Sequence, residues 1–227
     1  MNQPTPAIVP HSAVRPLPRW ALLLLCAAYV LPGFIGRDPW RGADVTAYGY
    51  MLELAGGHTS WFAPLLGALA PESDGLLPYW LGAWAIQITP DWLMPPEMAA
   101  RLPFMALLVL TLAATWYGVY YLARSPGAQP VAFAFGGEAK PSDYSRAIAD
   151  GALLALIACL GLAQLSHEAT GYLAQLACAT LIFFAVATLP YHTVAPAVAL
   201  VVGMIGLTLA GAPALATLLG LGSITLV

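Results

Sequence analysis

Hydrophobic residues occur in long runs that short polar segments interrupt. The six runs lie at residues 20–35, 102–123, 148–165, 172–189, 194–209 and 213–227. A helix needs about 20 apolar residues to cross the hydrocarbon core of a bilayer, and several of these runs are shorter. The last two therefore stay open to interpretation as one broken helix. The pattern predicts an all-α integral membrane protein, a polytopic helical bundle of five to six spans.

The longest interruption covers residues 36–100, between the first two runs. Within it, residues 45–54 can form an amphipathic helix with Tyr48, Met51 and Leu52 on one side, and residues 76–88 form a second, aromatic candidate. Tryptophan favours the headgroup level of a membrane, and this segment contains Trp61, Trp80, Trp84 and Trp92. We expect a long loop with short helices of its own that lies against the membrane surface.

The basic residues predict the orientation. One group consists of Arg15, Arg19, Arg124, Lys140 and Arg146, and the other of Arg37, Arg41 and Arg101. Alternate crossings place the two groups on opposite sides, and the larger group marks the cytoplasmic side. The sequence thus predicts a multi-pass protein of a bacterial inner membrane, with a cytoplasmic N-terminus and a periplasmic loop over residues 36–100. Residues 1–19, rich in proline, are expected to form a disordered cytosolic tail.

Composition narrows the function classes. Only 8% of the residues are charged, against about 25% in ordinary soluble domains. The net charge is −3 and no basic stripe occurs, which argues against nucleic acid as a partner. The three cysteines lie inside apolar runs without paired spacing, so neither a zinc site nor a disulfide framework is predicted.

Acidic residues concentrate directly after the first run. Five of the eleven lie between residues 36 and 87, namely Asp38, Asp44, Glu53, Glu72 and Asp74. Asp44 stands near Trp40 and Tyr48, where a partly desolvated carboxylate could serve as a general base. It also directly precedes the expected helix over residues 45–54, as an N-cap residue would. Both interpretations stay open at this point.

Three further charged residues stand at the ends of the apolar runs. Glu168 follows His167 between two runs, and an acid at a membrane boundary is either a functional group or a water-facing interfacial charge. Arg101 directly precedes the second run, where it could bind a phosphate or anchor the helix. Asp150 stands near the start of the third run and is interpreted as structural, because acids suit a helix N-terminus.

The order of the motifs is more specific than any one residue. An acidic loop opens with D-x-T-x-Y at Asp44, continues to P-Y-W-L-G-A at residues 78–83, and A-A-R-L-P at residues 99–103 leads into the second run. This order resembles the N-terminal part of the polytopic GT-C glycosyltransferases, in particular the aminoarabinose–lipid A transferases and the protein O-mannosyltransferases. The resemblance covers residues 37–124 best and extends more weakly to residues 166–168 and 208–213.

The resemblance implies a membrane glycosyltransferase that moves a sugar from a polyprenyl-phosphate donor to lipid A, a protein or another glycan. It implies Asp44 and Glu168 as catalytic residues. The substrate-binding residues that it implies are Arg101, Arg37, Arg41, Tyr48, Asp74, Tyr79 and His167. No metal ligand is assigned, and a divalent cation is the one cofactor left open.

Departures from the family pattern bear on this interpretation. Val45 replaces the second acid of the family's D-E pair, and Ala210 stands where relatives carry a lysine. Fewer cations weaken the binding of a lipid phosphate. Because family members are well over twice this length, residues 20–227 are expected to be an N-terminal transmembrane module of a longer protein. The alternatives are a non-catalytic polytopic protein, such as a transporter subunit or an assembly factor, and a truncated inactive transferase.

Overall fold

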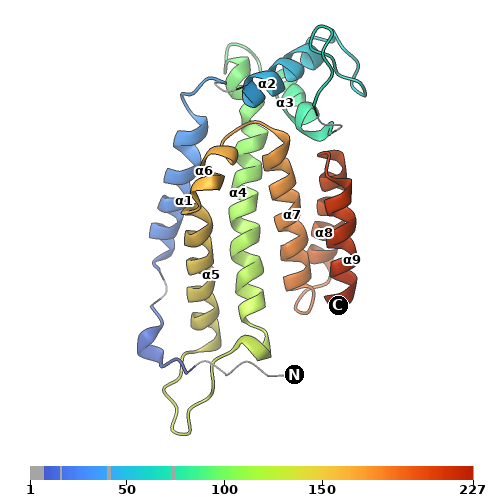
Figure 1. Cartoon of the computed structure of the whole chain (residues 1–227). Coiled ribbons are helices and arrows are strands. Elements are labelled where there is room, and N and C mark those ends of the chain that lie inside the picture. The colour runs from blue at the N-terminus through green and yellow to red at the C-terminus, as the bar shows by residue number, and fades with distance from the viewer. Residues whose placement is uncertain (1–7, 16, 40–41, 73–74, 227) are drawn as a thin grey trace.

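The computed structural model describes residues 8–15, 17–39, 42–72 and 75–226, and over these residues the chain is all-helical without a β-strand. The predicted helical class is therefore confirmed. The helices are, in chain order, α1 (Arg19–Phe34), α2 (Gly42–Ala55), α3 (Leu77–Ile88), α4 (Pro96–Ala123), α5 (Pro141–Ile157), α6 (Leu160–Leu165), α7 (Gly171–Thr188), α8 (Val194–Leu209) and α9 (Pro213–Leu226). Figure 1 shows an upright bundle with α2 and α3 lying across one end.

Helix α4 is the central element of the bundle. It packs against α1, α3, α5 and α7, and α7 in turn packs against α8 and α9. The main core follows one face of α4, where Phe104, Leu108 and Leu112 are buried against side chains of α1, α2, α5 and α7. A smaller core joins α7 to α8 and α9 through Cys178, Ile182, Leu207 and Ala216.

Two helices, α4 and α7, are long and apolar enough to cross a membrane, while α1, α8 and α9 are apolar but shorter. Of the predicted runs, residues 194–209 coincide with α8. The run over residues 148–165 is divided, because α5 ends at Ile157 and α6 begins at Leu160. The last two runs are separate helices, joined by a turn at Gly211, whose φ of 87° suits glycine. A bundle of five to six spans stays a prediction.

The bundle has two ends of different character (Figure 1). At the first, here called the loop end, the described parts of residues 35–95 meet residues 166–170 and 210–212. Gly75 illustrates this packing, since a Cβ there would lie 2.5 Å from the carbonyl carbon of Ala210. At the opposite end, here called the basic end, α5 begins and α4 ends, and the segment before α1 leads from this end up to the start of that helix. Arg124, Lys140 and Arg146 belong to the basic end, and Arg15 and Arg19 belong to the segment that rises from it.

The N-terminal segment differs from the expected disordered tail over its described residues, 8–15 and 17–18. The backbone N–H of His11 donates to the Gly137 carbonyl at 2.8 Å, and that of Ala139 donates to the Val9 carbonyl at 3.0 Å. These bonds attach the segment to the loop before α5.

Helix α2 also differs from the expected amphipathic helix. Its buried side chains are Asp44, Ala47, Tyr50, Met51 and Leu54, whereas Leu52 is exposed. Tyr48 is half-buried and packs at the edge of the main core. The buried face of α2 therefore includes a carboxylate, and this carboxylate defines the candidate site.

Candidate functional site

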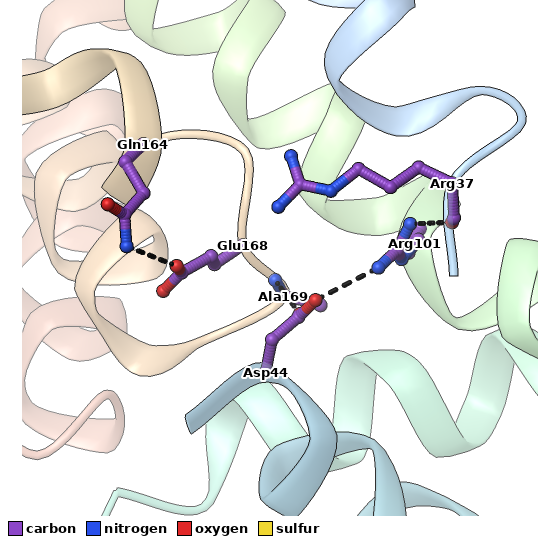
Figure 2. A network of polar contacts seen from close by, with 6 residues as sticks. All are labelled: Arg37, Asp44, Arg101, Gln164, Glu168 and Ala169. Atoms are coloured by element: carbon purple, nitrogen blue, oxygen red, sulfur yellow. Dashed lines mark hydrogen bonds and ion pairs between the residues drawn. The ribbon is translucent and has the colours of Figure 1, made fainter. Parts of the chain in front are cut away.

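Asp44 lies at the centre of a buried polar network at the loop end (Figure 2). It is the third residue of α2, and its exposed fraction is 0%. Its Oδ2 accepts a hydrogen bond from Arg101 Nη2 at 2.9 Å, and its Oδ1 accepts one from the Ala169 backbone N–H at 2.8 Å. Each carboxylate oxygen therefore already has a partner from a distant part of the chain.

Arg101 connects this carboxylate to the segment that follows α1. It lies in the second turn of α4, and only 2% of its surface is exposed. Its Nη1 donates to the Arg37 carbonyl oxygen while its Nη2 binds Asp44. In Figure 2 the Arg37 side chain itself extends toward the segment that carries Glu168 and Ala169. Asp44, Arg101 and the segment that carries Ala169 therefore meet at the loop end.

The environment of Asp44 revises both interpretations of this residue. Because α2 begins at Gly42, Asp44 lies inside the first turn, so the N-cap prediction is wrong. A helix N-terminus still favours a carboxylate at this position. The general-base interpretation requires a free carboxylate oxygen, but both oxygens of Asp44 accept hydrogen bonds and solvent does not reach them. In this arrangement Asp44 positions Arg101 and residues 166–170, and a substrate hydroxyl would have to displace one of its partners.

Glu168 is close to this network in sequence but turns away from Asp44. Its Oε1 accepts a hydrogen bond from Gln164 Nε2 at 3.0 Å, and its exposed fraction is 3%. Figure 2 shows the carboxylate directed toward Gln164, while the next residue, Ala169, contacts Asp44. The water-facing alternative is therefore wrong. Gln164 was missed in the sequence; it lies in the last turn of α6, and Glu168 follows that helix in the segment before α7.

His167 fixes the end of α1 against this segment. Its Nδ1 lies 2.6 Å from the Ala163 carbonyl oxygen, and its Nε2 lies 2.8 Å from the Tyr29 carbonyl oxygen. Its ring also packs against the rings of Tyr29 and Phe34. A Cβ at Gly33 would lie 1.8 Å from the His167 ring, so the close approach requires glycine. His167 is buried, with 6% exposed, which suits packing better than substrate binding.

The two predicted tyrosines lie beside the network. Burial, followed by the charge of Glu97 and a hydrogen bond to it, raises the pKa of Tyr48 to about 12. The phenol therefore stays neutral and donates to Glu97. Tyr79 stacks at a tilt on Tyr50, with ring centroids 5.3 Å apart. The remaining predicted residues, Arg41 and Asp74, lie outside the described residues.

Asp150 forms a second buried polar centre, far from the first. It is not at the start of its helix, as the dipole interpretation required, but well inside α5, and it is 3% exposed. Its Oδ1 accepts from Trp116 Nε1 at 2.8 Å, and its Oδ2 accepts from the Leu17 backbone N–H at 3.1 Å. Arg146 donates to the Leu17 carbonyl at 2.7 Å. Its interpretation as a structural residue agrees with these contacts.

Two cavities lie elsewhere in the bundle. The larger, about 710 Å³, is lined by α7, α8 and α9, and the smaller, about 300 Å³, by residues of α6, α7 and α9 together with Ser166. Neither lining includes Asp44, Glu168 or Arg101, so neither cavity is a pocket around these side chains. We base the candidate site on the polar network, because charged side chains converge there.

Among the described residues, no three His, Cys, Asp or Glu side chains are grouped so that they could hold a metal ion. The network consists of one carboxylate, one guanidinium and backbone groups. Comparisons with protein-family models, with curated proteins and with solved structures find no match to this chain.

Proposed function

We propose that the chain is the N-terminal module of a membrane glycosyltransferase that uses a polyprenyl-phosphate sugar, with five to six spans and the basic end in the cytoplasm. The observation that supports this proposal best is the buried network at the loop end. It joins four segments, the residues after α1, the first turn of α2, the start of α4 and the segment before α7. The order of the sequence motifs and the convergence of these four segments both indicate the loop end as the place of the active site.

The proposed reaction is displacement at the anomeric carbon of the sugar. The acceptor hydroxyl oxygen bonds to this carbon, the bond to the lipid phosphate oxygen breaks, and the phosphate leaves with the electron pair. The hydroxyl proton passes to a carboxylate. Lipid A, a protein or another glycan supplies the hydroxyl. A lipid donor suits a site at a membrane face, because its isoprenoid tail stays in the bilayer.

Asp44 can take this proton only after the loop end opens. Its Oδ1 is occupied by the Ala169 N–H, so the acceptor hydroxyl must replace that donor. The proposal therefore requires residues 166–170 to move away from α2 when substrate binds. Arg101 then remains on Oδ2 and holds the carboxylate in place, while Arg37, which is only half-buried, neutralises the donor phosphate.

Binding of the lipid phosphate tests the proposal directly. The purified chain in nanodiscs should bind undecaprenyl phosphate about tenfold more tightly than undecaprenol, since a hydrogen bond to a charged group contributes that much or more. Arg37→Gln should remove the preference. Lys140→Gln, a matched loss of one charge at the basic end, should keep it. Equal binding of the two lipids, or an Arg37→Gln variant with unchanged preference, would contradict the proposal.

A second measurement tests the opening of residues 166–170. Hydrogen exchange of a peptide that covers Ala169 should be slow in the free protein, because its amide is bound to a buried carboxylate. It should become faster when undecaprenyl phosphate and an acceptor are added. Exchange that slows further would mean that the segment stays closed on Asp44.

The burial of the network favours a second candidate function. Asp44 and Arg101 are 0% and 2% exposed, as expected for an ion pair that only fixes the packing of α2 on α4. A non-catalytic polytopic protein, such as an assembly factor, would use the pair in this way. In that case, neither lipid phosphate nor acceptor would change the hydrogen exchange of residues 166–170.

A further inference from the structure

The larger cavity is an apolar groove at the basic end of α7, α8 and α9. Its volume is about 710 Å³, within the range of known ligand sites. It is lined by the last turns of α7, the first half of α8 and the C-terminal half of α9, and these linings include Leu189, Pro196, Thr217 and Ser223. The two hydroxyl groups among them, of Thr217 and Ser223, bind backbone carbonyls of α9. The groove therefore suits a hydrocarbon chain.

A cation lies beside the turn that borders this groove. Arg124 follows α4 and is exposed, and its guanidinium lies 5.7 Å from the Tyr120 ring centroid and 5.9 Å from that of Tyr191. Tyr191 and His192 form the turn between α7 and α8, and His192 Nε2 is 3.0 Å from the Tyr121 hydroxyl. Among the described side chains, no carboxylate pairs with Arg124.

The groove and the cation are connected through this turn. Leu189, just before it, and Pro196, just after it, both line the groove, whereas Tyr191 within it contacts Arg124. Tyrosine and arginine at the end of an apolar bundle are typical of the headgroup level of a bilayer. A ligand that fits both parts has an apolar chain and a negative headgroup.

We propose that this surface binds an anionic phospholipid of the leaflet at the basic end, with one acyl chain in the groove and the headgroup phosphate on Arg124. The net charge decides between occupants, because the phosphate of a zwitterionic lipid is already paired with its own ammonium group, whereas that of an anionic lipid is free to pair with Arg124. The site lies at the opposite end of the bundle from Asp44 and does not depend on the proposed transferase function. An arginine that only complemented the C-terminal dipole of α4 would not discriminate between lipids.

Native mass spectrometry of the purified chain with added lipid tests the headgroup part. Phosphatidylglycerol should bind about fivefold more tightly than phosphatidylcholine with the same chains, the effect expected of one basic residue near an anionic lipid. Arg124→Gln should abolish the preference and Arg124→Lys should keep it. Lys140→Gln, which removes a charge at the same end but before α5, should also keep it. An unchanged preference in Arg124→Gln would overturn the proposal.

Two variants of α9 test the groove. Thr217→Trp fills it from its exposed side and should weaken phosphatidylglycerol binding about tenfold, the effect of two methylene groups no longer buried. Leu218→Trp places the same ring on the neighbouring exposed position, outside the groove, and should leave binding unchanged. Equal effects of the two variants would overturn the groove assignment.

Competition identifies the occupant. Undecaprenyl phosphate carries a negative headgroup and an apolar tail as well, so it is added against bound phosphatidylglycerol. We expect it to compete no better than phosphatidylglycerol itself. If it displaces the phospholipid at lower concentration, and Arg124→Gln abolishes this displacement, the surface is a polyprenyl site and the phospholipid proposal is wrong.

Discussion

Neutralising either partner of the Asp44–Arg101 pair should destabilise the protein strongly. The pair spans α2 and α4 at 2.9 Å, and the side chains are 1% and 2% exposed. Arg101→Met leaves the carboxylate buried with the Ala169 N–H as its remaining described donor. Asp44→Asn leaves the guanidinium buried on the Arg37 carbonyl. Removing one partner of a buried pair costs about 3–5 kcal/mol, whereas an aspartate that only capped a helix would lose under about 1 kcal/mol on this change.

The double variant separates the free energy of the Asp44–Arg101 interaction from that of the other contacts of the two residues. In Asp44→Asn/Arg101→Met no unpaired charge is buried, and the asparagine oxygen still accepts from Ala169. The Arg37 carbonyl loses one donor, so we expect a cost of about 1–3 kcal/mol. The sum of the two single-variant losses in the free energy of unfolding should therefore exceed the loss in the double variant, by a coupling free energy of about 3 kcal/mol or more.

Reversible unfolding in mixed micelles, followed by tryptophan fluorescence, measures these free energies. The matched control is the exposed pair of His58 and Glu53, which are 3.4 Å apart and 70% and 37% exposed. Glu53→Gln should cost less than about 1 kcal/mol. The reasoning is refuted if both single variants cost no more than this control and their effects add in the double variant.

Two further predictions concern packing and topology. Gly33→Ala should destabilise the protein by about 3 kcal/mol or more, since its Cβ would overlap the His167 ring, which hydrogen bonds hold in place. The control Gly151→Ala has open space around it and should be neutral or stabilising by up to about 1 kcal/mol. In a cysteine-free background, Ser60→Cys and Ser142→Cys should react with an impermeant thiol reagent from opposite sides of the membrane. Labelling of Ser142→Cys alone in intact spheroplasts would contradict the orientation.

The apolar runs predicted most helices, because a helix in apolar surroundings appears in the sequence as a continuous run of hydrophobic residues. Residues 194–209 were predicted with the bounds that α8 has. The bounds failed where polar residues enter a helix. Helix α4 begins at Pro96, before the apolar run, because Arg101 is stabilised inside it by Asp44. Helix α5 likewise begins at Pro141, seven positions before Ile148, since its polar first turns pack at the basic end.

The candidate site was predictable in its membership but not in its bonding. The order of the motifs was enough to name Asp44, Arg101 and Glu168 as candidate site residues. The partners that determine their roles are backbone groups, the Ala169 N–H and the Arg37 carbonyl. Every residue type carries the carbonyl and all except proline carry the N–H, so the sequence holds almost no signal for them. The full burial of Asp44 depends on these same backbone partners, so it could not be predicted either.

The contacts of Asp150 set an order in which the helices can assemble. A carboxylate within an apolar helix costs about 2.5–3.5 kcal/mol on insertion unless polar groups meet it. Its two donors come from Leu17, before α1, and from Trp116, in α4. Both are synthesised before α5, so if α5 crosses the membrane as proposed, a nascent chain can satisfy Asp150 as soon as this helix leaves the translocon. Asp44 differs, because Ala169 is made later, and the loop end closes only when the segment before α7 arrives.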